Sequence, residues 1–265
     1  MHMIQRTRRQ ILKTAGVCAA GAVLRGAPVR AQTRHTFVLV HGAWHGGWCW
    51  RRVADRLQAA GHTVYTPTLT GLGERSHLMR RDITLDTHIT DIVNVFKWEG
   101  IESAVLCGHS YGGFPIAGAV EQVLPQVASI VFLDAYVPRD GQTGLDIATP
   151  ASRDGINLGL KQGAIFRPPP KAETFNVNSK DRAWVDARMT PQPIGVSLQK
   201  IRLTNAIERV PTKTYVRAAN YPNPTFDAFL SEAKAKRWRT FSVPSGHDVM
   251  VDEPERLAKI LLESA

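Results

Sequence analysis

One pentapeptide of this sequence combines a possible nucleophile with the glycines that a sharp turn requires. Residues Gly108-His109-Ser110-Tyr111-Gly112 read G-x-S-x-G. They follow an apolar run at 104–107, which is typical of a strand, and they precede a stretch that is typical of a helix. This strand–turn–helix context presents a serine hydroxyl at the edge of a sheet, beside the positive end of a helix. We therefore predict that Ser110 is a catalytic nucleophile.

A serine hydroxyl is a poor nucleophile unless a base within hydrogen-bonding distance accepts its proton. Among the nine histidines, His247 has the best position for this role. It follows the last predicted strand and precedes the last predicted helix, so its loop crosses the sheet edge at which Ser110 is expected. His109 lies inside the turn itself and is expected to support it. We predict that His247 is the general base.

The loop after the first predicted strand is a candidate for stabilising negative charge. It begins His41-Gly42-Ala43-Trp44 and follows the strand at 36–40 directly. A loop in this place lies beside the turn that carries the serine, and it can point a backbone N–H at an oxyanion. We expect the two donors to be the backbone N–H groups of Ala43 and Tyr111, although a plain tight turn at Ala43 is the alternative.

With these motifs the sequence resembles the α/β-hydrolase superfamily. Within it, the chain is similar to a bacterial esterase group related to plant methyl-ester esterases and hydroxynitrile lyases. The resemblance covers nearly all of residues 36–265 and is carried by FVLVHGAWHGGW (37–48), TPTLTGLGERSH (66–77), GHSYGG (108–113), FLDAYVP (132–138) and GHD (246–248). It implies a sheet of about six mostly parallel strands with helices on both faces, a helical cap insertion and a serine–histidine–acid site.

The acid of this site departs from the pattern of the relatives. They usually place an aspartate just after the strand that corresponds to 214–217, but here residues 218–224 read AANYPNP and contain no carboxylate. Asp227 comes about three residues late and is expected on the next helix. Asp134 ends the predicted strand at 130–133, beside the serine strand, where haloalkane dehalogenases keep their acid. We predict Asp134 rather than Asp227.

Ester hydrolysis through an acyl-enzyme on Ser110 is the predicted reaction. The related lyases carry threonine and lysine where this chain has Gly42 and Asp248, which disfavours cyanohydrin cleavage. A non-catalytic small-ligand receptor on the same fold is the other alternative. Trp44, together with Trp48 and Trp50, favours a hydrophobic or aryl ester, although packed core tryptophans are an equal alternative. No cofactor or metal motif is present, so no cofactor is expected.

Short β-branched runs alternate with longer amphipathic stretches, which predicts a parallel sheet covered by helices on both faces. The expected strands are 36–40, 63–65, 104–107, 130–133, 214–217 and 239–243. The expected helices are 50–60, 86–99, 110–123, 226–236 and 254–264. No obvious strand occurs over about 137–210, which is too long for one loop in a compact domain. We expect this segment to form the cap, as a helical insertion over one end of the sheet.

Charge is distributed unevenly along the 265 residues. The formal charge is +10, but residues 1–31 hold six basic and no acidic side chains. The remaining chain holds 27 basic and 23 acidic residues, so a nucleic-acid partner is not expected. The arginine pair Arg8-Arg9, the short apolar run at 14–24 and the small residue Ala31 resemble a twin-arginine signal peptide. An amphipathic first helix is disfavoured because no acid balances the arginines.

These features predict export through the twin-arginine machinery and a periplasmic or secreted enzyme, without stable insertion in a membrane. The mature part, residues 32–265, is expected to be one α/β domain that acts on a small-molecule ester. Cys49 and Cys107 lack the spacing of a metal pair. A protein that folds before export folds in a reducing compartment, so we expect both cysteines to be buried rather than bonded as a disulfide.

Overall fold

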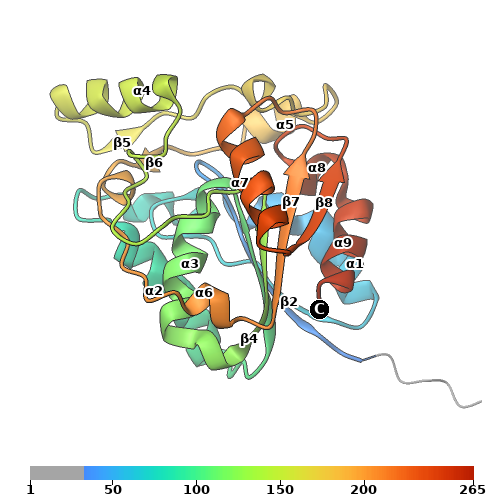
Figure 1. Ribbon diagram of the computed structural model, residues 1–265. Coiled ribbons are helices and arrows are strands. Elements are labelled where there is room, and N and C mark those ends of the chain that lie inside the picture. The colour runs from blue at the N-terminus through green and yellow to red at the C-terminus, as the bar shows by residue number, and fades with distance from the viewer. Residues whose placement is uncertain (1–32) are drawn as a thin grey trace, which may run out of the picture. The chain divides into compact units, whose positions relative to one another are not determined.

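A six-stranded parallel sheet forms the centre of the computed structural model, which describes residues 33–265 (Figure 1). Its order is β2-β1-β3-β4-β7-β8, and every neighbouring pair is parallel. The strands are β1 (Thr36–Val40), β2 (Thr63–Tyr65), β3 (Ala104–His109), β4 (Val127–Leu133), β7 (Thr212–Ala218) and β8 (Arg239–Val243). The predicted parallel sheet is therefore confirmed, with β3, β4 and β7 longer than their apolar runs indicated.

Helices cover both faces of the sheet, which explains why its central strands are apolar on both sides. Successive side chains of a strand point to opposite faces. Val38 and Val40 accordingly pack in one core with α2 (Leu85–Trp98), α3 (Gly113–Val123), α6 (Ala206–Arg209) and α7 (Pro224–Ala235). Phe37 and Leu39 pack in a second core with α1 (Arg51–Ala59), α8 (Val249–Asp252) and α9 (Pro254–Glu263). Cys49 and Cys107 are buried, unpaired members of this second core.

Much of the long segment between β4 and β7 lies at the end of the sheet toward which the strands point, whereas its last helix, α6, lies near the opposite end (Figure 1). Its longest element is α4 (Pro150–Lys161), which begins at an N-cap, Thr149, whose side chain accepts a hydrogen bond from the backbone of Ser152. The segment also contains α5 (Arg182–Asp186) and, unpredicted, a two-stranded antiparallel sheet of β5 (Phe166–Arg167) and β6 (Gln192–Pro193). Strands of two residues have no detectable period, so the sequence could not indicate them.

Candidate active site

Ser110 lies in the tight turn between β3 and α3. Its backbone φ is +53°, a left-handed conformation that is uncommon for residues other than glycine. A Cβ atom on Gly108 would lie 2.6 Å from the carbonyl oxygen of Gly112, and one on Gly112 would lie 2.8 Å from that of His41. The glycines of the pentapeptide are therefore required by close backbone approach, and the resulting turn places Ser110 in the wall of a cavity.

The loop after β1 passes directly over the serine. A Cβ atom on Gly42 would lie 2.9 Å from Ser110 Cβ and 2.8 Å from His109 Nδ1, so only glycine fits there. Within the described part of the chain, the next residue, Ala43, donates its backbone N–H to no acceptor. Tyr111 follows the serine at the start of the turn that leads into α3. Both of the expected oxyanion donors thus belong to segments that adjoin Ser110.

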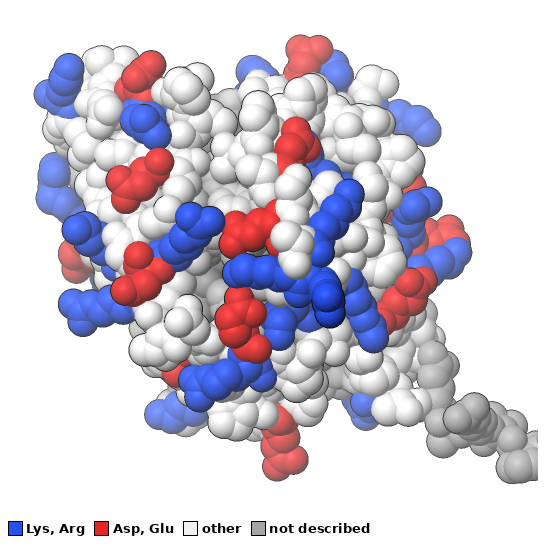
Figure 2. All heavy atoms as spheres, viewed as in Figure 1, with Lys and Arg blue, Asp and Glu red and all other residues white. Residues whose placement is uncertain are grey.

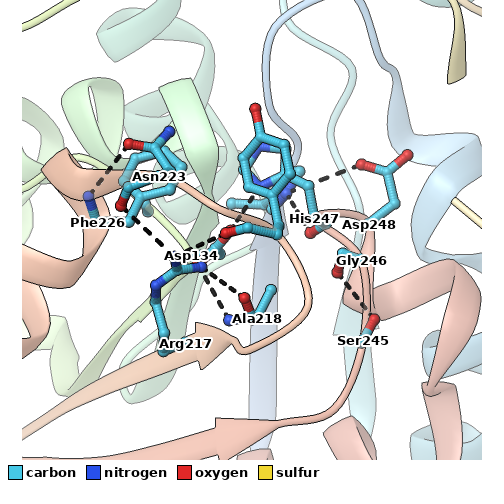
Figure 3. Close-up of polar contacts among 12 residues, drawn as sticks. Asp134, Arg217, Ala218, Asn223, Phe226, Ser245, Gly246, His247 and Asp248 are labelled. Atoms are coloured by element: carbon cyan, nitrogen blue, oxygen red, sulfur yellow. Dashed lines mark hydrogen bonds and ion pairs between the residues drawn. The ribbon is translucent and has the colours of Figure 1, made fainter. Parts of the chain in front are cut away.

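His247 and Asp134 form a short, buried contact (Figure 3). Nδ1 of His247 donates a hydrogen bond of 2.6 Å to Oδ2 of Asp134, and both side chains are almost completely buried. Asp134 follows β4 with a φ of +43°, and its backbone N–H donates to the carbonyl of Val216 in β7 at 2.6 Å. The end of β4 therefore presents the carboxylate to a histidine that is 113 residues away in the sequence.

Asp227, the other acid considered from the sequence, has a different partner. Its Oδ1 accepts a 2.9 Å hydrogen bond from Nε of Arg217, and its side chain is 62% exposed. Nη1 of the same arginine donates 2.8 Å to Oδ1 of Asp134, which also accepts from the backbone N–H of Ala218 at 3.1 Å. Arg217 therefore bridges the two carboxylates, and of the two it is Asp134 that hydrogen-bonds to His247.

Aromatic side chains pack around the ring of His247. Tyr221 stacks on it at 4.5 Å between ring centroids and Phe226 at 5.5 Å, while its backbone N–H donates to Phe175 O at 2.8 Å. Within residues 33–265 the hydroxyl of Ser110 forms no hydrogen bond to a protein group, although Ser110 and His247 line the same cavity. Such a contact is often loose in a free enzyme and tightens when substrate binds.

A second buried ion pair joins His45, in the loop after β1, to Asp248, in the loop that carries His247. His45 Nε2 lies 2.9 Å from Asp248 Oδ2, and His45 Nδ1 donates to the carbonyl of Ala43 at 2.8 Å. Burial opposes both charges, but the attraction of the pair outweighs it, so the pKa of His45 is raised and that of Asp248 is lowered to about 2. The pair ties the His247 loop to the loop after β1.

Sequence reasoning missed this pair because its members lie 203 residues apart. His45 lies in the quoted motif at 37–48 but was not singled out. Asp248 belongs to the GHD motif at 246–248 and occupies the place of a lyase lysine, and neither feature by itself indicates an ion pair. One feature of the sequence does point to such a pair, namely the aspartate directly after His247. If this loop is buried, the carboxylate needs a hydrogen-bonding or charged partner, because an unpaired buried charge is costly.

The remaining histidines around the site are neutral. Burial lowers the pKa of His41 to about 3 and that of His88 to about 4, and it also lowers the pKa of His109 strongly. His109 Nε2 donates to the carbonyl of His247 at 3.1 Å, which agrees with the supporting role expected for it. In the part of the chain that the structure describes, no group of three or more histidine, cysteine, aspartate or glutamate side chains is arranged to hold a metal ion.

The cavity that contains Ser110 and His247 has a volume of about 740 Å³. Its wall is largely apolar, and α4, β5 and the triple proline at 168–170 contribute one side of it. Of the three tryptophans expected near the substrate, only Trp44 lines it. Trp50 is completely buried, and Trp48 is partly buried and stacks on His45 at 5.2 Å, so neither lines the cavity. The reason is that 47–50 form a turn of 3-10 helix directed into the second core.

Similar proteins share both the sequence and the fold. Residues 37–260 match the alpha/beta hydrolase family. A carbendazim hydrolyzing esterase from Nocardioides sp. (strain SG-4G) is 38% identical over 85% of this chain and 97% of its own length. Methylesterase 10 of Arabidopsis thaliana is 33% identical over 65% of each chain.

A solved structure agrees with this assignment. It is that of an extracellular alpha/beta-hydrolase from a Paenibacillus species, described as sharing structural and functional homology with tobacco salicylic acid binding protein 2. It superposes with a TM-score of 0.76 at 25% identity, over 87% of this chain and 99% of its own. The parallel sheet, the serine turn and these relatives together show that the chain belongs to the alpha/beta hydrolase family.

Proposed function

We propose that this protein is a serine esterase that hydrolyses carboxylic esters through an acyl-enzyme on Ser110. The observation that carries the proposal is the 2.6 Å hydrogen bond between His247 and Asp134, beside a serine held in a strained turn of the same cavity. Two esterases among the relatives support the same class of reaction.

The reaction begins when Ser110 Oγ attacks the ester carbonyl and His247 Nε2 accepts the serine proton. Asp134 holds Nδ1–H of the ring and stabilises the imidazolium that forms. The backbone N–H groups of Ala43 and Tyr111 stabilise the oxyanion, a contribution of about 3–4 kcal/mol for a donor in comparable sites. His247 then protonates the departing alcohol. A water molecule, activated by the same ring, releases the acid and restores Ser110.

Hydrolysis is better supported than the lyase alternative. The position of the lyase lysine is occupied by Asp248, which is completely buried against His45 and does not line the cavity. The position of the lyase threonine is Gly42, where a Cβ atom would meet Ser110 and His109. Because Asp248 replaces that lysine, this position offers no positive charge to stabilise a departing cyanide. A receptor would have no need of the buried Asp134–His247 contact.

Hydrophobic or aryl esters are the proposed substrates. Trp44, Phe175 and Phe226 line the cavity beside Ser110 and His247, and they provide flat apolar surfaces for an aromatic or alkyl group. The relatives are named for carbendazim and for methyl esters, so both belong in a substrate panel that varies the acyl and the alcohol part.

We also propose that the protein is exported from the cytoplasm before it acts. The arginine pair at 8–9 and the apolar run at 14–24 fall outside the described residues, so their support comes from the sequence alone. The Paenibacillus relative is described as extracellular. None of the helices in the described part is both long enough and apolar enough to cross a membrane. We propose that a mature enzyme beginning near Gln32 acts in the periplasm or outside the cell.

The decisive experiment combines a variant with a covalent label. Ser110→Ala is expected to abolish turnover of an aryl ester apart from a residual rate of about 10³- to 10⁴-fold over water, because oxyanion and binding contacts remain. A fluorophosphonate should label the wild type once, at Ser110, and leave this variant unlabelled. The exposed Ser231→Ala serves as the matched control and should react normally. Labelling of another residue, or full turnover by Ser110→Ala, would refute the mechanism.

A further inference from the structure

Arg167 is the one permanently charged side chain among the residues that line the cavity, as far as the described chain shows. It lies in β5 of the segment between β4 and β7, and shares the wall of the cavity with Ser110 and His247. The walls around it are mostly apolar, including Leu158 and Phe166. A guanidinium in such surroundings remains charged even when burial lowers its pKa, as it does here.

No carboxylate compensates this charge within residues 33–265. Nη1 of Arg167 donates to Ser152 Oγ at 3.2 Å, and the guanidinium lies over the ring of Trp44 at 4.8 Å from its centroid. Arg167 appears in no ion pair with a described aspartate or glutamate. Arg217, which is also buried, is instead paired with two carboxylates, Asp134 and Asp227. An unpaired cation in an apolar wall is costly, so a ligand that supplies the missing charge would be favoured.

The free atoms of Arg167 are the ones that bind a carboxylate best. Nη1 is used by Ser152, whereas Nε is buried without a partner and Nη2 makes no hydrogen bond to the described protein. Nε and Nη2 form the side edge of the guanidinium, and their parallel N–H bonds match the two oxygens of a carboxylate. Trp44 covers one face of the group, and neither atom of this edge has a hydrogen-bond partner among the described residues.

We propose that Arg167 forms an anion subsite, so that preferred substrates are esters whose apolar body ends in a carboxylate remote from the scissile bond. This inference rests on the proposed esterase function. It narrows the substrate class to half-esters of dicarboxylic acids and other esters that carry a carboxylate remote from the scissile bond. The apolar cavity binds the body, Arg167 binds the free carboxylate, and the ester carbonyl lies at Ser110. The alternative is that Arg167 only supports the β5–β6 sheet against Trp44.

The test compares monomethyl esters of dicarboxylic acids with the matching ester amides, over a series of chain lengths. Acid and amide have the same shape and differ in charge, so the ratio of their kcat/KM values isolates the contribution of the anion. For at least one length, wild type should favour the acid by about tenfold or more. Arg167→Gln should bring the ratio to one or below, and Arg167→Lys should retain part of it, because lysine keeps the charge without the planar fork.

The matched control is Arg188→Gln. Arg188 also lies over a tryptophan, with its guanidinium 4.7 Å from the ring centroid of Trp184, but it is exposed and does not line the cavity. This variant should keep the wild-type ratio. A wild-type ratio near one at every length, or an unchanged ratio in Arg167→Gln, would overturn the anion subsite while leaving the esterase function intact.

A measurement without turnover separates the two proposals and does not depend on any Arg167 variant folding. Calorimetric titration of Ser110→Ala with a half-ester and with its amide should show tighter binding of the half-ester, again by about tenfold. Equal affinities, or no binding of either, would contradict the anion subsite. Failure of the esterase function would instead appear as a wild-type protein that neither hydrolyses a neutral aryl ester nor reacts with a fluorophosphonate.

Discussion

Asp134 divides its two carboxylate oxygens between different tasks. Oδ2 accepts from His247, while Oδ1 accepts from Arg217 and from the backbone N–H of Ala218. The carboxylate is completely buried, so without these donors its charge would be strongly disfavoured. Arg217 thus makes it possible to keep an ionised acid next to a histidine inside the protein, and it does so from the neighbouring strand, β7.

The choice between the two acids can be measured with two isosteric variants. Asp134→Asn should lower kcat by up to about 10⁴-fold, because an amide favours the wrong tautomer of His247. Asp227→Asn should change kcat by less than about tenfold, since its side chain is mostly exposed and bonds only to Arg217. Steady-state kinetics with one aryl ester decides the matter. A larger loss in Asp227→Asn than in Asp134→Asn would reverse the assignment.

The His45–Asp248 pair should make stability depend on pH. The pKa of His45 is raised above 6.5, so its contribution is complete below that pH and is lost as pH rises through the higher folded value. The pKa of Asp248 falls from 3.8 to about 2, so its contribution is present above pH 3.8 and is lost as pH falls toward 2. The pair therefore stabilises the fold most between pH 3.8 and 6.5.

Asp248→Asn should accordingly lower the free energy of unfolding by about 3–5 kcal/mol near the middle of this range, because it leaves His45 buried without its counter-charge. Urea unfolding at about pH 5.5 and at a series of higher pH values should show that this loss becomes smaller as pH rises through the raised pKa of His45, because the histidine of the wild type then also loses its proton. Asp55→Asn removes the same charge from an exposed site and should have little effect. A loss that grows with pH would contradict the charged state of His45.

At the scale of elements, the segment between β4 and β7 holds the loop after β1 and the loop that carries His247. Trp44, in the loop after β1, donates its backbone N–H to Gln192 of β6 at 3.1 Å and accepts from the backbone of Thr190 at 2.9 Å. The His247 loop contacts the same segment, because the backbone N–H of His247 donates a hydrogen bond to the carbonyl of Phe175. The insertion therefore supports the geometry of the site, in addition to forming one side of the cavity.

Gly246→Ala tests this support. An added Cβ would lie 2.2 Å from the carbonyl oxygen of Asn176, which belongs to backbone and cannot move aside easily. The His247 loop must then shift away from 172–177, and a displacement of about 1 Å at a reacting group costs about 10²-fold in rate. We expect kcat/KM for an aryl ester to fall by about this factor, with slower fluorophosphonate labelling and an unchanged circular dichroism spectrum. Wild-type kinetics in a folded variant would show that the contact has no bearing on the site.

At the scale of the whole molecule, the excess positive charge is concentrated near the N-terminus of the sequence. Residues 32–265 hold 27 basic and 23 acidic side chains. On the face drawn in Figure 2, lysine and arginine are interspersed with aspartate and glutamate. Much of the basic character of the chain therefore belongs to residues 1–31, which agrees with a role in targeting rather than in binding a polyanion.

Replacement of both arginines of the pair, Arg8→Lys with Arg9→Lys, should trap the precursor in the cytoplasm, because the twin-arginine machinery recognises that pair. Cell fractionation with detection of a C-terminal tag should show loss of the periplasmic enzyme, and N-terminal sequencing of the wild type should begin near Gln32. The exposed pair Arg80→Lys with Arg81→Lys controls for the substitution itself. Normal periplasmic recovery of the first double variant would refute this export route.

Local patterns of the sequence determined the parallel sheet and singled out Ser110 and His247. The alternation of apolar strands with amphipathic helices depends on neighbouring residues, and so do the glycines that surround Ser110. Burial of both faces of β1 and β3 follows directly from their uninterrupted apolar runs. For this reason the order of the main elements and the predicted sheet agree with the structure, whereas the two-residue strands β5 and β6 have no such pattern.

Tertiary structure alone decided which charges meet. From the sequence, Asp134 and Asp227 were both compatible with His247, and only the folded chain places Arg217 between them. The partner of Asp248 is 203 residues away in the sequence. That Arg167 has no carboxylate beside it becomes apparent only when the cavity wall is assembled from the folded chain. The physical reason is that the cost of a buried charge depends on every group within a few ångströms, and the fold brings those groups together from distant parts of the chain.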